Sequence, residues 1–407
     1  MTVNDFDPDE YEEIEVSEEE DTERLDEGKR RFLLLLQIFL LVGIVGVGAL
    51  FLRYFVSPAP LPQLIGTDNL AQTCAIPSYK FMIEGVNKPI GIAVSPDNQR
   101  IYVSESGEDK FIKMFDRDGN FITQFAPLGT DKLTRSYVYM ATDPAGRLFA
   151  INRDSNSIDV FDKDGNYLDS IIRADMTISK LLSSAGISLE NVVITRYDFV
   201  NNTIFYQVGD GPTEKHTFSL EAKEQFSPMG IRFDAEGNML LTDVSPGLHS
   251  IAIIPAKDLA DLSTFQPTIQ RFGKQGEGKM DLYFPQSVAK TSKGEFIISD
   301  GNNARITKWA ADQTSAITFG FGSGDGAVGL PRGSWMDKND CYLVVDKLNS
   351  GVYVFDLSQS EPAYVAYFGE SGISEGLFNY PTDITVDGTG RLYITDMNNN
   401  RVQIWSY

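Results

Sequence analysis

The chain repeats one phrase several times, and this repetition constrains its fold more than any other feature. Residues Pro381–Trp405 resemble Pro285–Trp309, and Pro89–Ser104 begins in the same way. The units recur at a period of roughly 45–50 residues, which indicates repeated supersecondary units. Each unit has room for four short strands, as a β-propeller blade does. We therefore expect an all-β propeller.

Each unit alternates short apolar strands with polar turns. First strands such as Asp383–Val386 lead into turns with Gly or Asn, which tolerate the positive φ of tight hairpins. Second strands such as Leu392–Thr395 are rich in aromatic and β-branched residues. We count seven units, whose first strands begin near Gly91, Tyr139, Val192, Gly230, Ser287, Gly333 and Asp383.

The third of these units is degenerate. It occupies about residues 191–226, lacks the turn signatures, and follows a helical-looking insert at Thr177–Ile187. Its strand-like runs are Val192–Phe199 and Thr203–Val208. Seven blades are favoured, and six are expected if this unit only elaborates its neighbours.

The last unit is one strand short. It stops after its third strand, Arg401–Tyr407, while a spare strand, Tyr79–Ile83, lies just before the first unit. Pairing these two segments would close the ring and remove an exposed sheet edge. The propeller is therefore expected to span residues 79–407.

The units resemble the NHL repeat family of propellers over residues 79–407. The resemblance rests on the proline that opens a unit, the Asp-Gly type of turn, and a Ser/Thr-Asp-x-x-Asn-x-Arg-Ile/Val signature. The signature is complete at Ser299–Ile306 and Thr395–Val402. We expect it to be structural, with Asp capping the loop backbone, Asn in a left-handed turn and Arg packing across the blade.

The N-terminal part of the chain has a different composition. Residues 1–27 hold fourteen Asp or Glu and one Arg, too few apolar groups to fold alone. After Lys29, Arg30 and Arg31, Phe32–Leu52 is a run of 21 residues with one polar side chain, Gln37. A helix of this length can span a hydrocarbon core of ~30 Å. We expect a disordered acidic tail at 1–31, a transmembrane helix at 32–52 and a Pro-containing linker at 53–78.

The basic residues around this segment predict its orientation. Three precede it and only Arg53 follows it directly, which favours a cytoplasmic N-terminus and a propeller outside the cell. A cleaved signal peptide is the alternative, but the run is long, the preceding region is acidic, and Ser57–Pro60 is a poor cleavage site. With this orientation, residues 32–52 contact the lipid bilayer, and the acidic tail is available to a partner in the cytoplasm.

The negative charge of the chain limits the classes of partner that it can bind, and its two cysteines can form at most one disulfide within the chain. The formal charge is −22, and residues 54–407 carry 43 acidic and 30 basic residues, which argues against nucleic acid. The two cysteines, Cys74 and Cys341, are both expected on the outer side. They either pair or remain as two partly buried thiols.

No compact set of residues predicts catalysis, a cofactor or a resident metal. The only histidines, His216 and His249, lie in different units without the spacing of metal ligands. Asp116–Asn120 and Asp162–Asn166 look like pieces of calcium loops, yet they fall where a hairpin turn is needed. A calcium ion held by oxygen ligands in the central channel is an alternative that the sequence allows.

Loops between units and loops from second to third strands should share one face, where propellers usually bind. The candidate partner residues on it are Arg135, Tyr137, Asn152, Tyr283, Phe284, Asn302, Trp335, Lys347, Phe378, Tyr380 and Asn398. Exposed aromatic and Arg side chains would anchor a partner. Alternatively, the aromatic side chains pack blade against blade.

We therefore expect a membrane-tethered module that binds a protein, peptide or glycan outside the cell. The alternative, implied by the resemblance to NHL propellers, is an ectoenzyme that uses an ion in the channel for lactonase- or lyase-like chemistry. The scarcity of histidine favours the binding module.

Overall fold

The computed structural model describes Arg30, Phe32 and residues 34–44, 74–127, 130–219 and 226–407. The chain divides into two units, Met1–Ala71 and Gln72–Tyr407. In the first, Arg30, Phe32 and residues 34–44 are helical. Among the residues described, no helix is both long and apolar enough to cross a membrane. Most of the predicted tail and linker, and residues 33 and 45–52 of the predicted membrane segment, lie outside these residues.

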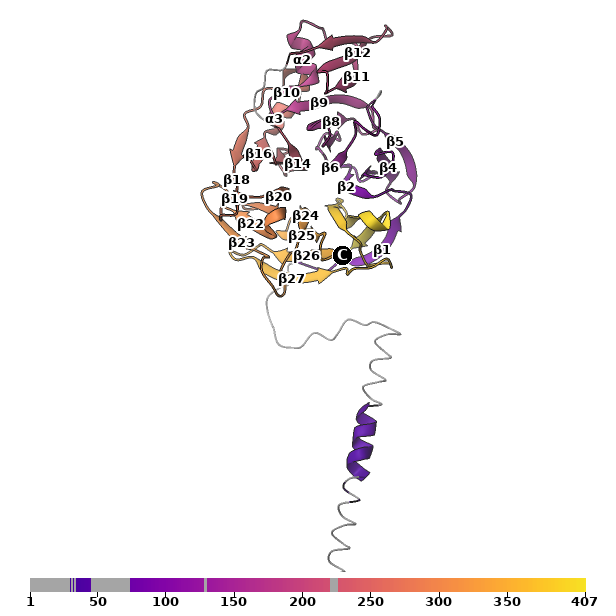
Figure 1. Cartoon of the computed structure of the whole chain (residues 1–407), viewed down its shortest axis with the longest axis vertical. Coiled ribbons are helices and arrows are strands. Elements are labelled where there is room, and N and C mark those ends of the chain that lie inside the picture. The colour runs from indigo at the N-terminus through magenta and orange to yellow at the C-terminus, as the bar shows by residue number, and fades with distance from the viewer. Residues whose placement is uncertain (1–29, 31, 33, 45–73, 128–129, 220–225) are drawn as a thin grey trace, which may run out of the picture. The chain divides into compact units, whose positions relative to one another are not determined.

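The second unit is a β-propeller of antiparallel sheets arranged around an axis (Figure 1). We number its blades one to six in chain order. Blade one is β2–β5 (Pro89–Val94, Arg100–Glu105, Ile112–Asp116, Phe121–Phe125), and blade two is β6–β9 (Tyr137–Thr142, Leu148–Asn152, Ser157–Phe161, Tyr167–Arg173) with the short β10 (Met176–Thr177). Blade three is β14–β17 (Pro228–Phe233, Met239–Asp243, Ser250–Ile254, Gln270–Phe272), and blade four is β20–β23 (Pro285–Lys290, Phe296–Asp300, Arg305–Trp309, Ala316–Phe319). Blade five is β24–β27 (Pro331–Met336, Cys341–Asp346, Gly351–Asp356, Ala363–Phe368), and blade six is β28–β30 (Pro381–Val386, Arg391–Asp396, Arg401–Ser406) with β1 (Ser78–Ile83).

The first strands of these blades contact one another around a closed ring. β2 touches β6 and β28, β14 touches β6 and β20, and β24 touches β20 and β28. The third predicted unit stands outside this ring as a separate sheet beside β9, made of β11 (Val192–Asp198), β12 (Thr203–Val208) and β13 (Glu214–Thr217). Within the described residues the ring thus holds six first strands. The favoured count of seven is not confirmed, and the alternative of six accounts for the sheets.

The separate sheet has a core of its own, which explains why it does not need a place in the ring. Ile194, Ile204 and Tyr206 pack against Ile178 and Leu182 of helix α2 (Ile178–Ser184). Thr177 caps this helix by accepting the Lys180 N–H at 3.1 Å. The predicted helical insert is therefore confirmed, and together with this sheet it elaborates blade two.

The ring closes as the sequence predicts. β1 pairs antiparallel with β30, with Ile83 opposite Val402 and Ser78 opposite Ser406. Cys74, just before β1, forms a disulfide with Cys341 at the start of β25. The two cysteines are therefore paired, and they tie the start of the propeller to blade five while β1 completes blade six.

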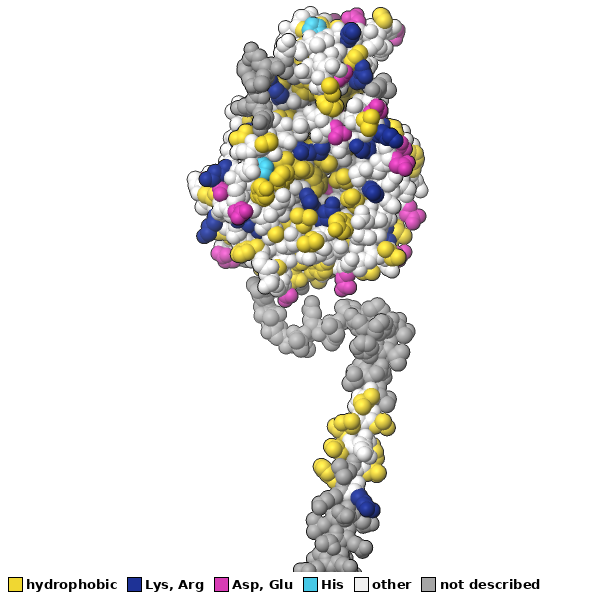
Figure 2. Space-filling model, in the orientation of Figure 1, with side chains coloured by type: hydrophobic (Ala, Val, Ile, Leu, Met, Phe, Trp, Pro, Cys, Tyr) yellow, Lys and Arg dark blue, Asp and Glu magenta, His cyan; other side chains and the backbone are white. Residues whose placement is uncertain are grey.

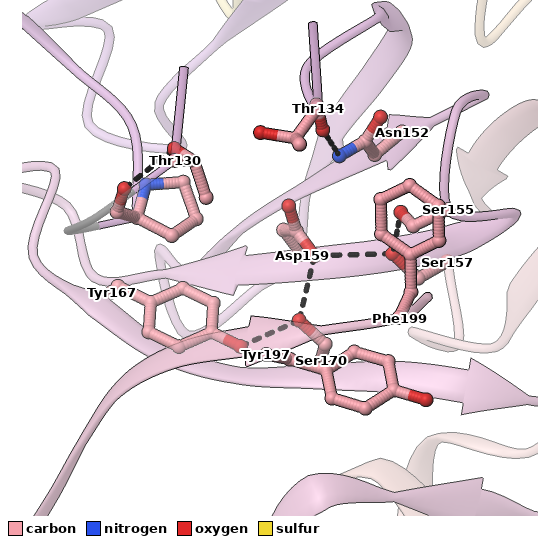
Figure 3. A pocket seen from close by; sticks show the side chains of 11 residues that line it. Thr130, Thr134, Asn152, Ser155, Ser157, Asp159, Tyr167, Ser170, Tyr197 and Phe199 are labelled. Carbon is pink, nitrogen blue, oxygen red and sulfur yellow. Dashed lines mark hydrogen bonds between the residues drawn. The ribbon is translucent and has the colours of Figure 1, made fainter. Parts of the chain in front are cut away.

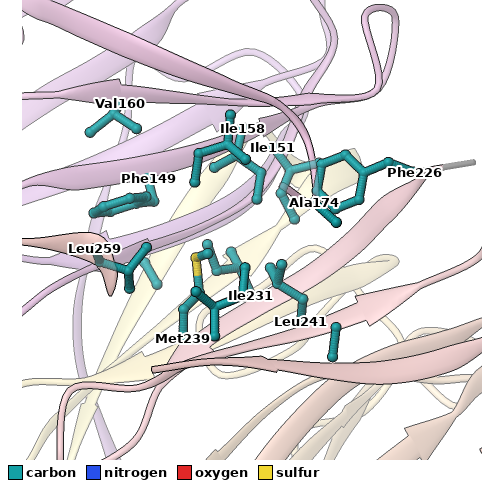
Figure 4. Close-up of a cluster of buried hydrophobic side chains, with 14 of the residues drawn as sticks. Phe149, Ile151, Ile158, Val160, Ala174, Phe226, Ile231, Met239, Leu241 and Leu259 are labelled. Atoms are coloured by element: carbon teal, nitrogen blue, oxygen red, sulfur yellow. The ribbon is translucent and has the colours of Figure 1, made fainter. Parts of the chain in front are cut away.

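Most of the core lies between the blades. Each gap between neighbouring blades holds its own apolar cluster, such as the one that Phe149, Ile151, Ile231 and Leu241 form between blades two and three (Figure 4). This cluster also buries side chains from α3 (Ala256–Leu259) and the 3-10 helix η1 (Leu262–Thr264). The remaining short elements are η2 (Gly301–Asn303), η3 (Met397–Asn399) and the parallel pair β18 (Lys274–Gln275) and β19 (Asp281–Leu282). Burial contributes about 25 cal/mol per Å² of apolar surface, so the fold depends on blade-to-blade contact.

The NHL-like signature ties loops together, as expected. The Asp300 carboxylate accepts the Tyr283 backbone N–H at 2.6 Å and Arg305 Nε at 2.8 Å. Arg305 also donates to the carbonyl oxygens of Glu277, Gly278 and Asp281. One detail differs from expectation, since Asn303 bonds the Asp300 carboxylate and the left-handed residue is Ala304, with φ 49°.

Candidate functional site

The loops between blades and the loops from second to third strands lie together on one side of the ring, which we call the loop face. Asn302 donates its backbone N–H to the Tyr283 carbonyl at 3.0 Å, and Asn398 donates to Asn379 at 3.0 Å. Equivalent bonds run from Ser106 to Lys88, from Arg153 to Ser136, from Val244 to Ser227 and from Lys347 to Leu330. One such bond per blade holds the two kinds of loop side by side, as the sequence predicts.

Six of the eleven candidate residues reach the surface of the loop face. Asn302 and Asn398 are exposed, Tyr380 is 45% exposed, and Tyr283, Phe284 and Lys347 are half-buried. Phe284 and Tyr380 each precede the proline that opens a blade, with left-handed φ of 52° and 58°. Such values are uncommon for bulky residues, so the loops fix these two side chains at some cost. Seen from this side, hydrophobic and basic side chains surround the centre of the ring (Figure 2).

Four candidates are instead buried. The Tyr137 hydroxyl donates to Asp159 at 2.7 Å, and the Phe378 ring stacks on Trp405 at 5.9 Å. The Arg135 guanidinium lies 4.2 Å from the Phe111 ring centre, and Asn152 accepts the Ser136 N–H at 3.0 Å. These side chains pack the blades and loops rather than meeting solvent.

Trp335 lies at the opposite end of the channel from the loop face. It sits four residues after Pro331 in β24, whereas Tyr283 and Tyr380 precede their prolines and Tyr137 replaces one. The structure therefore places Trp335 apart from the other candidate partner residues. Because each first strand runs from the loop face to the other side, a shift of several residues moves a side chain along the whole strand.

A small polar cavity of about 20 Å³ lies where blade two meets the separate sheet, and Asn152, Asp159 and Tyr197 belong to its lining (Figure 3). Here the Asp159 carboxylate accepts hydrogen bonds from the hydroxyl groups of Tyr137, Ser157 and Ser170 at 2.7, 3.2 and 2.6 Å. Burial raises the pKa of Asp159, which these hydrogen bonds oppose. A cavity of this size holds about one water, so the network is an internal one.

Across the axis of the ring, an ion pair joins opposite blades. Arg232 of blade three places Nη2 2.5 Å from Asp383 Oδ1 of blade six, and both side chains are buried. The Asp383 carboxylate also accepts the backbone N–H groups of Ile92 and Ile384 at 3.1 and 2.9 Å. Burial raises the pKa of Asp383, and the adjacent guanidinium opposes that shift. We call this pair the waist of the channel.

The waist also satisfies backbone groups at the inner edges of the sheets. The other Arg232 hydrogen bonds go to carbonyl oxygens of Met140 (3.5 Å), Ile231 (3.0 Å), Ser334 (3.2 Å) and Ile384 (3.0 Å). First strands leave such carbonyls without a ladder partner, and buried ones need a donor. With the Ile92 N–H bound by Asp383, the pair connects blades one, two, three, five and six.

The repeat makes room for this pair. At the position of Arg232 the blades carry Ala93, Ala141, Arg232, Ala289, Trp335 and Thr385, and at that of Asp383 they carry Gly91, Tyr139, Gly230, Ser287, Gly333 and Asp383. A Cβ added to Gly333 would overlap the Asp383 carboxylate. Our sequence reasoning missed both residues. The available signal was a charge at positions where most units have Ala or Gly.

At the loop-face end of the channel, Arg332 and Lys347 form a basic mouth. Arg332 Nε is buried, and no described residue accepts a hydrogen bond from it. Burial lowers the pKa of Lys347, and the nearby positive charge of Arg332 lowers it further. Lys347 Nζ lies 5.2 Å from the Tyr380 ring centre, and neither basic side chain forms an ion pair with a described carboxylate. Two neighbouring cations thus have no anionic partner in the part of the chain that the structure describes.

Tyr139 lies near charged groups of both the basic mouth and the waist. Burial raises the pKa of its hydroxyl, Arg332 and Arg232 oppose this shift, and Asp383 adds to it. The hydroxyl donates to the Thr382 carbonyl at 3.5 Å, so Tyr139 of blade two reaches blade six. Charged groups of both levels therefore act on one buried phenol.

At the opposite end, a cavity of about 820 Å³ opens between the first-to-second-strand turns of blades three, four and five. We call it the turn cavity. Arg232 and Ser334 belong to its lining, as do the apolar side chains of Phe233, Trp335 and Met336. Lys290 bonds Asp234 at 3.0 Å and Glu236 at 2.9 Å. Burial alone would lower the pKa of Lys290, but these two hydrogen bonds raise it.

Within the part of the chain that the structure describes, no group of three or more His, Cys, Asp and Glu side chains is placed to hold a metal ion. The two segments that look like pieces of calcium loops are turns. Asp116 Oδ1 accepts the N–H groups of Asp118 and Asn120 at 2.9 and 2.8 Å, and Asp162 caps its own turn in the same way. Their carboxylates thus stabilise hairpins.

Known proteins share this architecture. Residues 378–405 match the family model of the NHL repeat. The chain is similar to a catalytically inactive virginiamycin B lyase from Staphylococcus aureus solved with quinupristin, at 12% identity and a TM-score of 0.50, over 81% of this chain and 100% of that one. It is also similar to a gluconolactonase from Xanthomonas campestris (17% identity, TM-score 0.49, 80% and 87% covered) and to a streptogramin B lyase (11%, 0.48, 80% and 96%). At such identities the likeness concerns the fold alone. The chain is therefore a β-propeller protein that carries the NHL repeat.

Proposed function

We propose that the propeller is a binding module whose loop face holds an acidic segment of a protein or peptide. The observation that carries this proposal is the basic mouth, where Arg332 and Lys347 lie together without a described anionic partner. A guanidinium fork and an ammonium group suit a carboxylate, which would replace the missing counter-charge. In a propeller region with a net charge of −13, such a local basic site also gives direction to the approach of a ligand.

The surroundings of the basic mouth suit a protein partner. Tyr283, Phe284 and Tyr380 are half-buried or exposed on the same face, and aromatic side chains beside Arg are typical anchors of protein interfaces. The backbone of Phe284 and Tyr380 is fixed before a proline, so little entropy is lost on binding. The exposed Asn302 and Asn398 amides add hydrogen-bonding groups at the edge.

We further propose that this module is tethered to a membrane through residues 32–52, with the acidic tail in the cytoplasm and the propeller outside the cell. The basic cluster before the apolar run supports this orientation. The Cys74–Cys341 disulfide fits an oxidising compartment. Protease added to intact cells should release the propeller and spare the tail, and the reverse pattern would refute the orientation.

The binding proposal is tested by calorimetric titration with a pentaglutamate peptide, with pentaglutamine as the neutral probe. Pentaglutamate should bind the wild-type protein, and Arg332→Met or Lys347→Met should weaken it at least about tenfold, the effect of 1.4 kcal/mol. Lys338→Met is the matched control, because it removes a cation at the turn cavity instead. Equal loss in all three variants would mean nonspecific attraction and would refute the proposal.

The enzymatic alternative is separated by its own measurement. A propeller enzyme with an ion in its channel should retain about one divalent metal per chain after purification, whereas the binding module needs none. Metal analysis of the purified propeller by mass spectrometry decides between the two. A stoichiometric metal that chelation removes together with lactone hydrolysis would favour the enzyme.

A further inference from the structure

We propose that the turn cavity is a second ligand site, separate from the loop face, and that it takes a neutral sugar of a glycan. Its volume of about 820 Å³ falls within the range of small-molecule sites. The Arg232–Asp383 pair lies between this cavity and the basic mouth, so the two sites are on opposite sides of the waist. The choice of a neutral sugar rests on charge, on an indole surface and on hydrogen-bonding capacity.

The charges around the turn cavity balance. Its lining contains the cations Arg232, Lys290, Lys293 and Lys338 and the anions Asp234, Glu236 and Asp337, and Asp383 compensates Arg232 from behind. Lys290 is paired with both Asp234 and Glu236. Because the charges of the lining and Asp383 sum to zero, a charged ligand would meet no excess of the opposite charge and would lose its hydration, which is unfavourable. A neutral polar ligand avoids that penalty.

The wall of the cavity offers an aromatic surface. Trp335 is half-buried there, and no described residue accepts a hydrogen bond from its indole N–H. Among the described residues of the lining, Phe233 and Met336 are also only partly buried. The C–H face of a pyranose ring can lie against an indole, and the free N–H can donate to a sugar hydroxyl.

The polar side of the cavity suits the hydroxyl groups of such a ring. Glu236 Oε2 and Lys290 Nζ are 2.9 Å apart, and the Glu236 side chain is 62% exposed. Paired carboxylate and ammonium groups accept and donate hydrogen bonds to neighbouring hydroxyls without changing the net charge of the site. A sugar with one apolar face and a hydroxyl edge therefore matches both sides of the cavity.

Intrinsic fluorescence tests this proposal directly, because the other two tryptophans, Trp309 and Trp405, are buried. Titration with neutral trisaccharides (maltotriose, cellotriose and tri-N-acetylchitotriose) should change the emission of the wild-type protein with saturation, at a Kd of about 1 mM or below for at least one of them. Trigalacturonate, the anionic probe, should bind at least about tenfold more weakly.

Two variants separate the site from general effects. Trp335→Phe should abolish the fluorescence change and weaken binding in calorimetry at least about tenfold, and Glu236→Gln, at an exposed position, should weaken it several-fold. Lys347→Met, on the loop face, should leave sugar binding unchanged. The proposal is overturned if none of the neutral sugars saturates, if trigalacturonate binds as well, or if Glu236→Gln and Trp335→Phe both bind like the wild type.

Discussion

The two ends of the central channel differ in how they treat charge. At the loop face, Arg332 and Lys347 lie together with no described carboxylate to pair with. At the turn cavity, Lys290 lies between Asp234 and Glu236, and the charges of the lining balance once Asp383 is included. The same first strands run between the two ends, and the flanking loops and turns supply the other residues. One propeller scaffold can therefore carry unpaired charges at one end of its channel and paired charges at the other.

The largest expected effect comes from breaking the buried Arg232–Asp383 pair of the waist. Arg232→Met leaves the Asp383 carboxylate buried without its cation, and breaking a buried pair in this way costs about 3–5 kcal/mol. Urea unfolding of the variant measures this loss. The double variant Arg232→Met with Asp383→Asn should recover part of it. A single variant within about 0.5 kcal/mol of the wild type would contradict the structural role of the waist.

Reversing one charge at each end of the channel tests whether the two ends differ as ligand sites. Lys347→Glu should lower the affinity for pentaglutamate at least about 100-fold, because like charges in an interface cost several kcal/mol. Lys338→Glu at the turn cavity should change it less than about threefold, since a distant surface charge is screened. Calorimetry at fixed ionic strength gives both values. If the two variants behave alike, the ends do not differ as ligand sites.

Acidification is expected to lower the free energy of unfolding by protonating His249, which holds a loop of the loop face. Burial lowers the pKa of His249, which Asp243 and Asp300 oppose, and its Nδ1 accepts the Phe284 N–H at 3.2 Å only when neutral. Because the folded state then binds fewer protons than the unfolded state, this contribution to stability is complete above the unfolded pKa and is lost as pH falls below it.

The measurement is the free energy of unfolding in urea at pH 7.5 and 5.5. His249→Asn keeps a hydrogen-bond acceptor for Phe284 but does not titrate, so the variant should lose less stability on acidification than the wild type. An identical loss in both proteins would assign the pH dependence to other groups.

The smallest expected effect concerns Tyr380. Tyr380→Ala removes a 45% exposed ring and its contact with Lys347, and it should cost less than about 1 kcal/mol. Its neighbour in the same loop, Phe378, is fully buried against Trp405, and Phe378→Ala should cost about 3–5 kcal/mol. Thermal unfolding of the two variants compares them. Similar losses would mean that Tyr380 also serves the core.

Structural features that recur in the repeated units can be predicted from the sequence. The blade pattern, the closing strand Tyr79–Ile83 and the structural signature at Asp300 follow from local patterns and from the need to remove a sheet edge. The blade number is harder, because the unit at β11–β13 has strand patterns but builds its own core with α2.

The residues that meet in the central channel are harder to predict from the sequence. Arg232 and Asp383 are 151 residues apart and meet only because the ring places their blades opposite each other. Burial of Tyr137 and Phe378 depends on which side of a loop packs between blades, and composition does not reveal that. Aligning the six first strands position by position would have shown both charges as exceptions.

The disulfide at Cys74 determines how the propeller bears tension. Any pull transmitted from the N-terminal residues meets Cys74 before it meets β1, and the covalent bond to Cys341 diverts it into β25. The hydrogen bonds between β1 and β30, which would otherwise be peeled apart one after another, are spared. Force applied at the N-terminal side is thus carried by blade five rather than by the closing strand of blade six. In the oxidised protein the disulfide carries this force. In the reduced protein the hydrogen bonds between β1 and β30 would carry it instead.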